Sequence, residues 1–264
     1  MQMSTRERTV RSRDKLRKFT HEERVEIAQR ISSLLLDKYK DSVLAVFIYA
    51  STAKKLDRPY SDLEIAAVMR DGIDIPTKSY LYKGLLIETY YPQESNLLKE
   101  ARKVGQNWPI EADQYRNRKV LFERDGWARR LEEAVEESEK ADFSTALHHS
   151  TMAVLESLAS LRNAALTGNS LDAKTRGFWF AYDAARLLLL LNRRYVITTS
   201  WFWKQTFECS DKPRDFESLV RTIAGFDRHE SVETTSQAAE QLWDELLDMV
   251  ESRGVNVESS QLIV

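Results

Sequence analysis

Two acidic residues stand one residue apart inside an apolar run, in the stretch SDLEIAAVM at 61–69. Side chains at positions i and i+2 of a β-strand project from the same face. The sequence therefore predicts that the carboxylates of Asp62 and Glu64 lie side by side, with Leu63 and Ile65 on the other face. Two like charges held this close raise each other's pKa unless a cation lies between them. Mg²⁺ suits this role because it binds one or two carboxylates together with substrate phosphates.

A lone Asp-x-Glu pattern is also typical of a strand edge whose acids face water, but two further features favour the metal interpretation. Glu88 lies in the strand-like run LLIETYY at 85–91 and adds a third acid that a neighbouring strand could direct to the same point. Upstream, an apolar run ends at Ala50 and Ser51, and Lys54 follows. A small residue, a hydroxyl and free backbone N–H groups in such a turn predict a phosphate-binding site.

The elements that must position these residues alternate in type along the first half of the chain. A capping-box pattern at Thr20 and Glu23 predicts a helix that runs to about residue 40, with Ile27, Ile31, Leu34 and Leu35 on one face. The remaining predictions for this half are a strand at 43–50, a loop at 51–61 with a turn of helix at its start, a strand at 61–69, a hairpin at 79–91, a helix at 93–104, a loop at Trp108-Pro109, and a strand near 118–123.

Helical patterns dominate the second half, where they are expected at about 127–140, 142–166, 172–192, 214–224 and 233–252. The expected fold class is α+β, with a mixed-sheet domain over 1–126 followed by a helical bundle domain over 127–264. Residues 1–19 form a basic extension of the first domain, which we interpret as a solvated terminus rather than a nucleic-acid arm.

Composition excludes several classes of protein. With 42% hydrophobic and 30% charged residues, the chain is expected to fold and dissolve in water. Cys209 is the only cysteine, which excludes intramolecular disulfides and multi-thiolate metal sites. The most apolar stretch, LLLLL at 187–191, is far shorter than the ~20 residues of a spanning helix. We therefore expect a cytoplasmic protein without a membrane partner.

The pattern resembles that of the DNA polymerase β-like nucleotidyltransferases. It consists of a strand that ends at a small residue and Ser, then a loop, a strand with Asp-x-Glu, and a third acid on a later strand. The branch that this chain resembles is the kanamycin (aminoglycoside 4′) nucleotidyltransferase family. The resemblance covers roughly 20–250, and it is strongest in DRPYSDLEIAAVM at 57–69 and in the spacing from Asp62 to Glu88.

The resemblance assigns roles to individual residues of the first domain. It implies that Ser51 and Lys54 bind the triphosphate of ATP or another NTP. It also implies that two Mg²⁺ ions are held by Asp62, Glu64 and Glu88, of which Asp62 and Glu64 count as catalytic. One departure is Ala50, which stands where the family has a glycine and narrows the approach of the backbone to phosphate.

In the second half, AVLESLASLRNAA at 153–165 resembles the family's helix that carries the general base, and it places Glu156 at that position. Ser160 and Asn163 follow at spacings of four and seven residues on the same helix face, so the three are expected to line an acceptor pocket. Ser160 is a second departure, because the family has a lysine there. The resemblance also implies a homodimer whose active sites lie at the interface.

The predicted function is Mg²⁺-dependent transfer of a nucleoside monophosphate from an NTP to a hydroxyl of a small molecule, in particular an aminoglycoside. The alternatives are transfer to a nucleic acid or protein hydroxyl, and a degenerate protein that binds nucleotide without catalysis. We expect no nucleic-acid partner. The aromatic runs GFWFAY at 177–182 and WFW at 201–203 are interpreted as packing of the core and the dimer interface, rather than stacking on a base or sugar.

Overall fold

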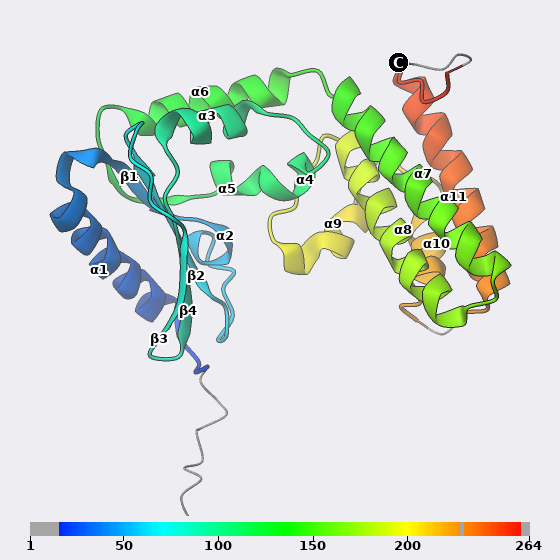
Figure 1. The fold of residues 1–264 in the computed structure, drawn as a ribbon, viewed down its shortest axis with the longest axis horizontal. Coiled ribbons are helices and arrows are strands. Elements are labelled where there is room, and N and C mark those ends of the chain that lie inside the picture. Colours follow the sequence, from blue (N-terminus) through cyan, green and yellow to red (C-terminus); the bar gives the residue numbers. More distant parts are fainter. Residues whose placement is uncertain (1–15, 228–229, 260–264) are drawn as a thin grey trace, which may run out of the picture. The chain divides into compact units, whose positions relative to one another are not determined.

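The computed structural model describes residues 16–227 and 230–259, so most of the basic extension at 1–19 lies outside the described residues. The chain divides into two compact units (Figure 1). The first unit comprises the described part of Met1–Ala101 together with Gln114–Ala134, and the second comprises Arg102–Asp113 together with the described part of Val135–Val264.

A five-stranded sheet forms the centre of the first unit, in the strand order β3-β4-β2-β1-β5. The strands are β1 (Val43–Ile48), β2 (Leu63–Met69), β3 (Lys78–Tyr82), β4 (Leu85–Tyr90) and β5 (Lys119–Glu123). β2 and β4 are parallel, whereas the other neighbouring strands are antiparallel. This mixed sheet and the helical second unit confirm the α+β fold class.

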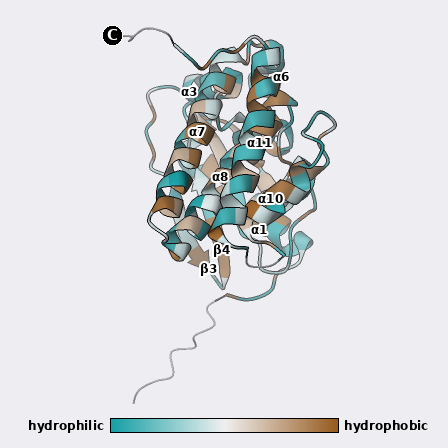
Figure 2. Ribbon diagram, turned by 90° about the vertical axis from the view of Figure 1, so that its right-hand side faces the viewer, coloured by the Kyte–Doolittle hydropathy of each residue, from teal (hydrophilic) through white to brown (hydrophobic). Residues whose placement is uncertain are grey.

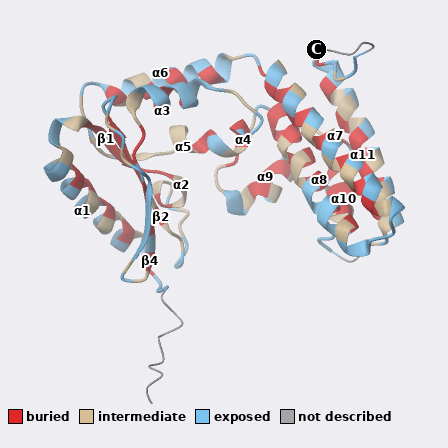
Figure 3. Ribbon diagram, viewed as in Figure 1, coloured by how far each residue is buried: buried red, intermediate tan, exposed pale blue. Residues whose placement is uncertain are grey.

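Burial along the strands follows the pattern of apolar residues in the sequence. All six residues of β1 are buried, and every one of them is apolar (Figure 3). In β4, buried and more exposed residues alternate, so this strand buries one face only. The buried face of the sheet packs on α1 (His21–Tyr39), whose Ala28 and Leu35 belong to the same core as Leu63 and Ile87.

The start of α1 confirms the predicted capping box, because the Glu23 N–H donates to the Thr20 hydroxyl at 3.2 Å and the Thr20 N–H donates to Glu23 at 2.8 Å. The predicted apolar face is wrong at Leu34, which is 66% exposed. The buried face instead carries Arg24, Ala28, Ser32 and Leu35. A charged residue therefore takes a core position that periodicity alone would give to an apolar one.

Arg24 is held at that position by the loop before β2. Its side chain is 1% exposed and forms an ion pair with Asp57, also 1% exposed, at 3.0 Å. His21 Nδ1 lies 2.8 Å from the other oxygen of the same carboxylate. The guanidinium also donates to five backbone carbonyl oxygens, those of Phe19, Thr20, Arg58, Pro59 and Ser61. One buried cation thus ties the chain before α1 to the loop that leads into β2.

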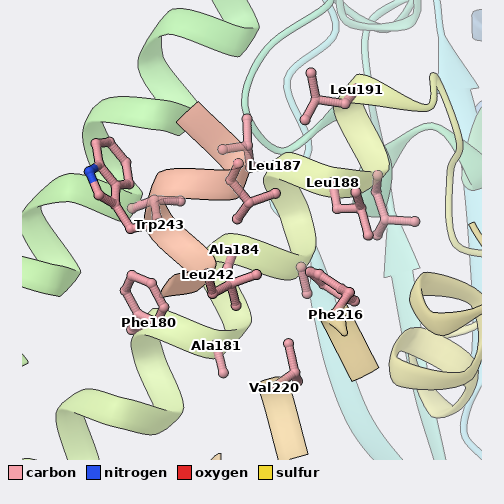
Figure 4. Packing of buried hydrophobic residues seen from close by; sticks show 14 of the residues in the cluster. Phe180, Ala181, Ala184, Leu187, Leu188, Leu191, Phe216, Val220, Leu242 and Trp243 are labelled. Carbon is pink, nitrogen blue, oxygen red and sulfur yellow. The ribbon is translucent and has the colours of Figure 1, made fainter. Parts of the chain in front are cut away.

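Most of the second unit consists of three long helices and a short one: α7 (Ser144–Leu166), α8 (Ser170–Leu191) and α11 (Val232–Ser252) are long, and α10 (Phe216–Ala224) has nine residues. Hydrophilic and hydrophobic residues alternate along α7 and α11 (Figure 2). The apolar faces of α8, α10 and α11 meet around Phe180, Leu187, Phe216 and Leu242 (Figure 4). These helices confirm the predicted helical second half.

Several shorter helices complete the chain: α2 (Ala50–Ala53), α3 (Glu94–Arg102), α4 (Trp108–Glu111), α5 (Asp113–Arg116), α6 (Trp127–Lys140) and α9 (Phe202–Phe207). The prediction of a loop at Trp108-Pro109 is wrong, because these residues begin α4. The Trp108 ring lies 5.1 Å from Phe143 and 6.0 Å from Tyr195, measured between ring centroids. Residues 102–113 therefore pack with the second unit, although they precede the boundary expected at 126.

We expect Arg24→Met to lower the free energy of unfolding by about 3–5 kcal/mol, because it leaves the buried Asp57 carboxylate without its main partner. Urea denaturation followed by circular dichroism measures this loss. Arg30→Met removes an exposed arginine from the same helix and should change stability by about 0.5 kcal/mol or less. Equal unfolding midpoints for the two variants would contradict the structural role of the Arg24–Asp57 pair.

Candidate active site

The register of the sheet makes direct neighbours of two of the three predicted acids. In the parallel pair of β2 and β4, Glu64 lies opposite Glu88 and Leu63 lies opposite Ile87. Leu63 and Ile87 are buried in the core beneath α1. Because successive side chains of a strand alternate between faces, Glu64 and Glu88 project together from the other face of the sheet. Asp62 directly precedes β2.

Tyr49 directly follows β1 and interacts electrostatically with all three acids. Its side chain is buried, and burial raises the pKa of the Tyr49 phenol above its ordinary value. The negative charges of Glu64, Glu88 and Asp62 raise this pKa further. Asp62, Glu64 and Glu88 are therefore all within electrostatic range of Tyr49, while the strand register itself pairs only Glu64 with Glu88. Tyr49 was not predicted from the sequence, where it reads as one more apolar residue of the strand.

The three carboxylates do not form a complete ligand cage by themselves. Within residues 16–227 and 230–259, no group of three or more His, Cys, Asp or Glu side chains is arranged to hold a metal ion. Glu88 accepts a hydrogen bond from the Ser79 hydroxyl of β3 at 3.3 Å, which draws its carboxylate toward that strand. Oxygen ligands of this kind fit Mg²⁺, which takes one or two carboxylates and completes its shell with water and phosphate oxygens.

Ser51 and Lys54 lie in and directly after α2, between β1 and the loop. The Ser51 carbonyl oxygen accepts hydrogen bonds from the N–H groups of Lys54 at 3.3 Å and Leu56 at 3.0 Å, which closes a tight turn. The Tyr49 N–H donates to the Glu64 carbonyl at 3.2 Å. The turn that carries Ser51 is therefore anchored to the strand that carries Glu64.

The backbone of Ala50 has a φ of 55°, in the left-handed region. A Cβ atom in this region costs roughly 1–2 kcal/mol, and glycine avoids that cost. This is the position where the sequence departs from the glycine of the family that it resembles. The left-handed backbone is thus a physical reason for a glycine at position 50. The chain forms the same turn with Ala50.

The loop before Asp62 is fixed by the same arginine that determines the buried face of α1. Arg24 donates to the Ser61 carbonyl through Nε at 3.1 Å and through Nη2 at 2.9 Å, and Ser61 is the residue before Asp62. The Ser61 hydroxyl accepts from the Arg58 N–H at 2.9 Å. Arg24 and Asp57 were missed as positioning residues. The available signal was an arginine at helical spacing from Ala28 within a buried stripe.

The predicted acceptor residues lie in the second unit, on α7. Glu156 and Ser160 line a cavity of about 350 Å³ on the faces of α7 and α8. Asn163 is exposed and is not among the residues that line this cavity. Beside it in the chain, Arg162 forms an ion pair with Glu240 of α11. The structure therefore brings together two of the three predicted acceptor residues.

The other residues that line this cavity were not predicted from the sequence; they are Ala153, Ser157, Arg176, Trp179 and Asp183. GFWFAY was interpreted as packing of the core and the dimer interface; Phe180 is fully buried in the core, and Trp179 is 51% exposed in the single chain. Asp183 is the one acid in the stretch AYDAARLLLLL at 181–191, which is otherwise mostly apolar. An acid in such a stretch was a signal that could have identified it.

Comparison with known proteins gives three results. The family model of the KNTase C-terminal domain matches residues 125–256. Proteins named aminoglycoside nucleotidyltransferase (4′), from Staphylococcus aureus and from a Bacillus species, are each 24% identical over 245 residues, which are 92% of this chain and 96% of theirs. A crystal structure of a nucleotidyltransferase-like protein from Exiguobacterium sibiricum 255-15 superposes with a TM-score of 0.56 at 16% identity, covering 85% of this chain and 75% of that one.

No helix within the described residues combines the length and the apolar character that crossing a membrane requires.

We expect Ala50→Gly to raise the free energy of unfolding by about 1 kcal/mol, because it relieves the left-handed backbone strain at this position. Urea denaturation measures the change. Ala53→Gly in the same turn is the matched control, since Ala53 has no positive φ and a glycine there should lower stability by roughly 0.5–1 kcal/mol. The interpretation of strain fails if both substitutions destabilise the protein equally.

Proposed function

This chain belongs to the family defined by the KNTase C-terminal domain and is a nucleotidyltransferase, and we propose that it transfers a nucleoside monophosphate from ATP or another NTP to an aminoglycoside hydroxyl. The observation that carries the proposal is the register of β2 and β4, which sets Glu64 opposite Glu88 beside Asp62. The names of the two curated relatives, which align over nearly the whole chain, support the choice of acceptor.

In the proposed reaction, the first unit binds the NTP. Asp62, Glu64 and Glu88 would hold two Mg²⁺ ions, with Glu88 turning from Ser79 toward the other two acids. Bound Mg²⁺ neutralises phosphate charge and orients the oxygens of the triphosphate. The Ser51 hydroxyl would donate a hydrogen bond to a phosphate oxygen, and the ammonium group of Lys54 would approach the triphosphate as a point charge.

The second unit would supply the base and the acceptor pocket. The Glu156 carboxylate would take the proton from the attacking hydroxyl, a step typically worth 10²–10⁴-fold in rate. The Ser160 hydroxyl lines the same cavity and would help to orient the acceptor. We also propose that the protein acts as a homodimer in the cytoplasm, with α7 of one copy completing the site of the other. Sedimentation at several protein concentrations tests the dimer.

Transfer can be tested directly with purified protein, Mg²⁺, labelled ATP and a panel of aminoglycosides, by following label transfer and pyrophosphate release. We expect both products with at least one aminoglycoside, and neither in the presence of a chelator. Asp62→Asn should abolish transfer, because it removes a carboxylate that holds Mg²⁺. Glu156→Gln should lower the rate by about 10²–10⁴-fold, because the amide cannot accept the hydroxyl proton.

Asp74→Asn is the matched control for these variants, since it removes an exposed carboxylate from the same unit as Asp62. It should transfer label at the rate of the unsubstituted protein. The proposed acceptor would be wrong if no aminoglycoside received label while another hydroxyl compound still caused pyrophosphate release. The enzyme class would then still stand.

A further inference from the structure

We infer that Asp183 is a second acceptor-binding carboxylate, and that together with Glu156 it selects acceptors that carry an ammonium group near the reacting hydroxyl. The inference rests on the proposed function, because it takes the cavity at Glu156 as the acceptor pocket. It adds a residue from α8 that determines which acceptors bind.

The cavity is built from two helices of the same unit. Glu156, Ser157 and Ser160 come from α7, and Trp179 and Asp183 come from α8, where they are spaced by four residues and share a face. Its volume of about 350 Å³ lies at the lower end of the range for small-molecule sites, about 300–1,000 Å³. A site of this size accommodates part of a sugar-based acceptor and leaves the rest in solvent.

Asp183 is fixed in orientation but retains capacity to accept hydrogen bonds. The Ser157 hydroxyl donates to Asp183 Oδ2 at 2.7 Å, and the nearest Arg186 nitrogen lies 3.5 Å from Oδ1. The latter contact is an ion pair whose separation is too long for a strong hydrogen bond. A carboxylate offers about four lone-pair sites, so one short hydrogen bond leaves sites for a ligand. The Asp183 side chain is 17% exposed, which leaves it accessible from the cavity.

The charges around the cavity favour a cationic ligand. Burial raises the pKa of Asp183, the Ser157 hydrogen bond and the Arg186 charge lower it, and the Glu156 carboxylate raises it. Glu156 and Asp183 line the same cavity and repel each other, and the Arg186 ion pair offsets part of this repulsion at Asp183. An ammonium group bound between the two would reduce this repulsion, whereas a neutral ligand would not. The cation that lines the cavity, Arg176, is 3.2 Å from Asp172, so part of its charge is already balanced.

Trp179 gives the cavity an aromatic wall. Its side chain is 51% exposed, and its ring meets Tyr182 edge-on at a centroid distance of 6.1 Å. An indole face attracts an ammonium group and covers the apolar face of a sugar ring. A large exposed aromatic beside two carboxylates thus provides both parts of a recognition site for an amino sugar.

Isothermal titration calorimetry of the full chain with kanamycin A tests the inference by binding alone. Asp183→Asn should weaken binding by about 10-fold or more, the usual effect of losing one charged partner. Binding of fully N-acetylated kanamycin A, which has lost its positive charges, should not change with the substitution. Asp248→Asn is the matched control, because it removes an exposed carboxylate of α11 and should leave both affinities unchanged.

Two further measurements distinguish recognition from folding. Trp179→Ala alters an exposed side chain, so it should leave the melting temperature nearly unchanged while weakening kanamycin A binding. In the transfer assay, Asp183→Asn should raise the KM for the aminoglycoside and leave the KM for ATP unchanged. If Asp183 had a purely structural role, Asp183→Asn would lower the melting temperature and weaken binding of the neutral and the cationic ligand alike. That result would overturn the inference.

The inference and the proposed function fail in different ways. If kanamycin A is a substrate and Asp183→Asn binds it within about twofold of the unsubstituted protein, the inference is wrong and the proposed function stands. If kanamycin A binds with the predicted dependence on Asp183 but no pyrophosphate is released with any aminoglycoside, the cavity recognises amines and the proposed reaction is wrong.

Discussion

The buried ion pair of Arg24 and Asp57 is the interaction on which the geometry of the first unit depends. It stabilises the fold only because the guanidinium is also satisfied by backbone carbonyls, since a buried ion pair with poor hydrogen bonding can cost more than it gains. Those carbonyls come from the start of α1 and from the loop that ends at Ser61. The pair therefore fixes the rotation of α1 against the sheet. It also fixes the position of Asp62, the residue directly before β2.

This constraint explains how acids can stand in a segment that otherwise belongs to the core. β2 buries Leu63 and Ile65 beneath α1, and the alternation of the strand then leaves Glu64 on the opposite face. The parallel partner β4 repeats the arrangement with Ile87 and Glu88. β2, which is buried at every residue except Glu64, and its partner β4 thus hold two carboxylates close together. Their mutual repulsion is unfavourable, and a divalent cation bound between them would relieve it.

In the second unit, the same helices pack in the core on one side and line the cavity on another. One side of α8 is fully apolar and joins α10 and α11 around Phe180 and Leu187. Another side carries Trp179 and Asp183 and lines the cavity with Glu156. Because the apolar side already anchors the helix, residues on the cavity side can change with little effect on the fold. This is consistent with a pocket where Ser160 replaces the lysine of the family that the chain resembles.

The sequence alone determined the strands and long helices, the Asp-x-Glu pattern with Glu88, and the family, because these follow from local periodicity and from a motif of fixed spacing. The tertiary structure decided what depends on contacts between distant segments. These are the register that pairs Glu64 with Glu88, the burial of Arg24 by a loop more than thirty residues away, and the cavity that joins Asp183 to Glu156. Periodicity shows on which face of a helix or strand the apolar residues gather. Only packing against a partner element determines which face is buried and which side chains meet.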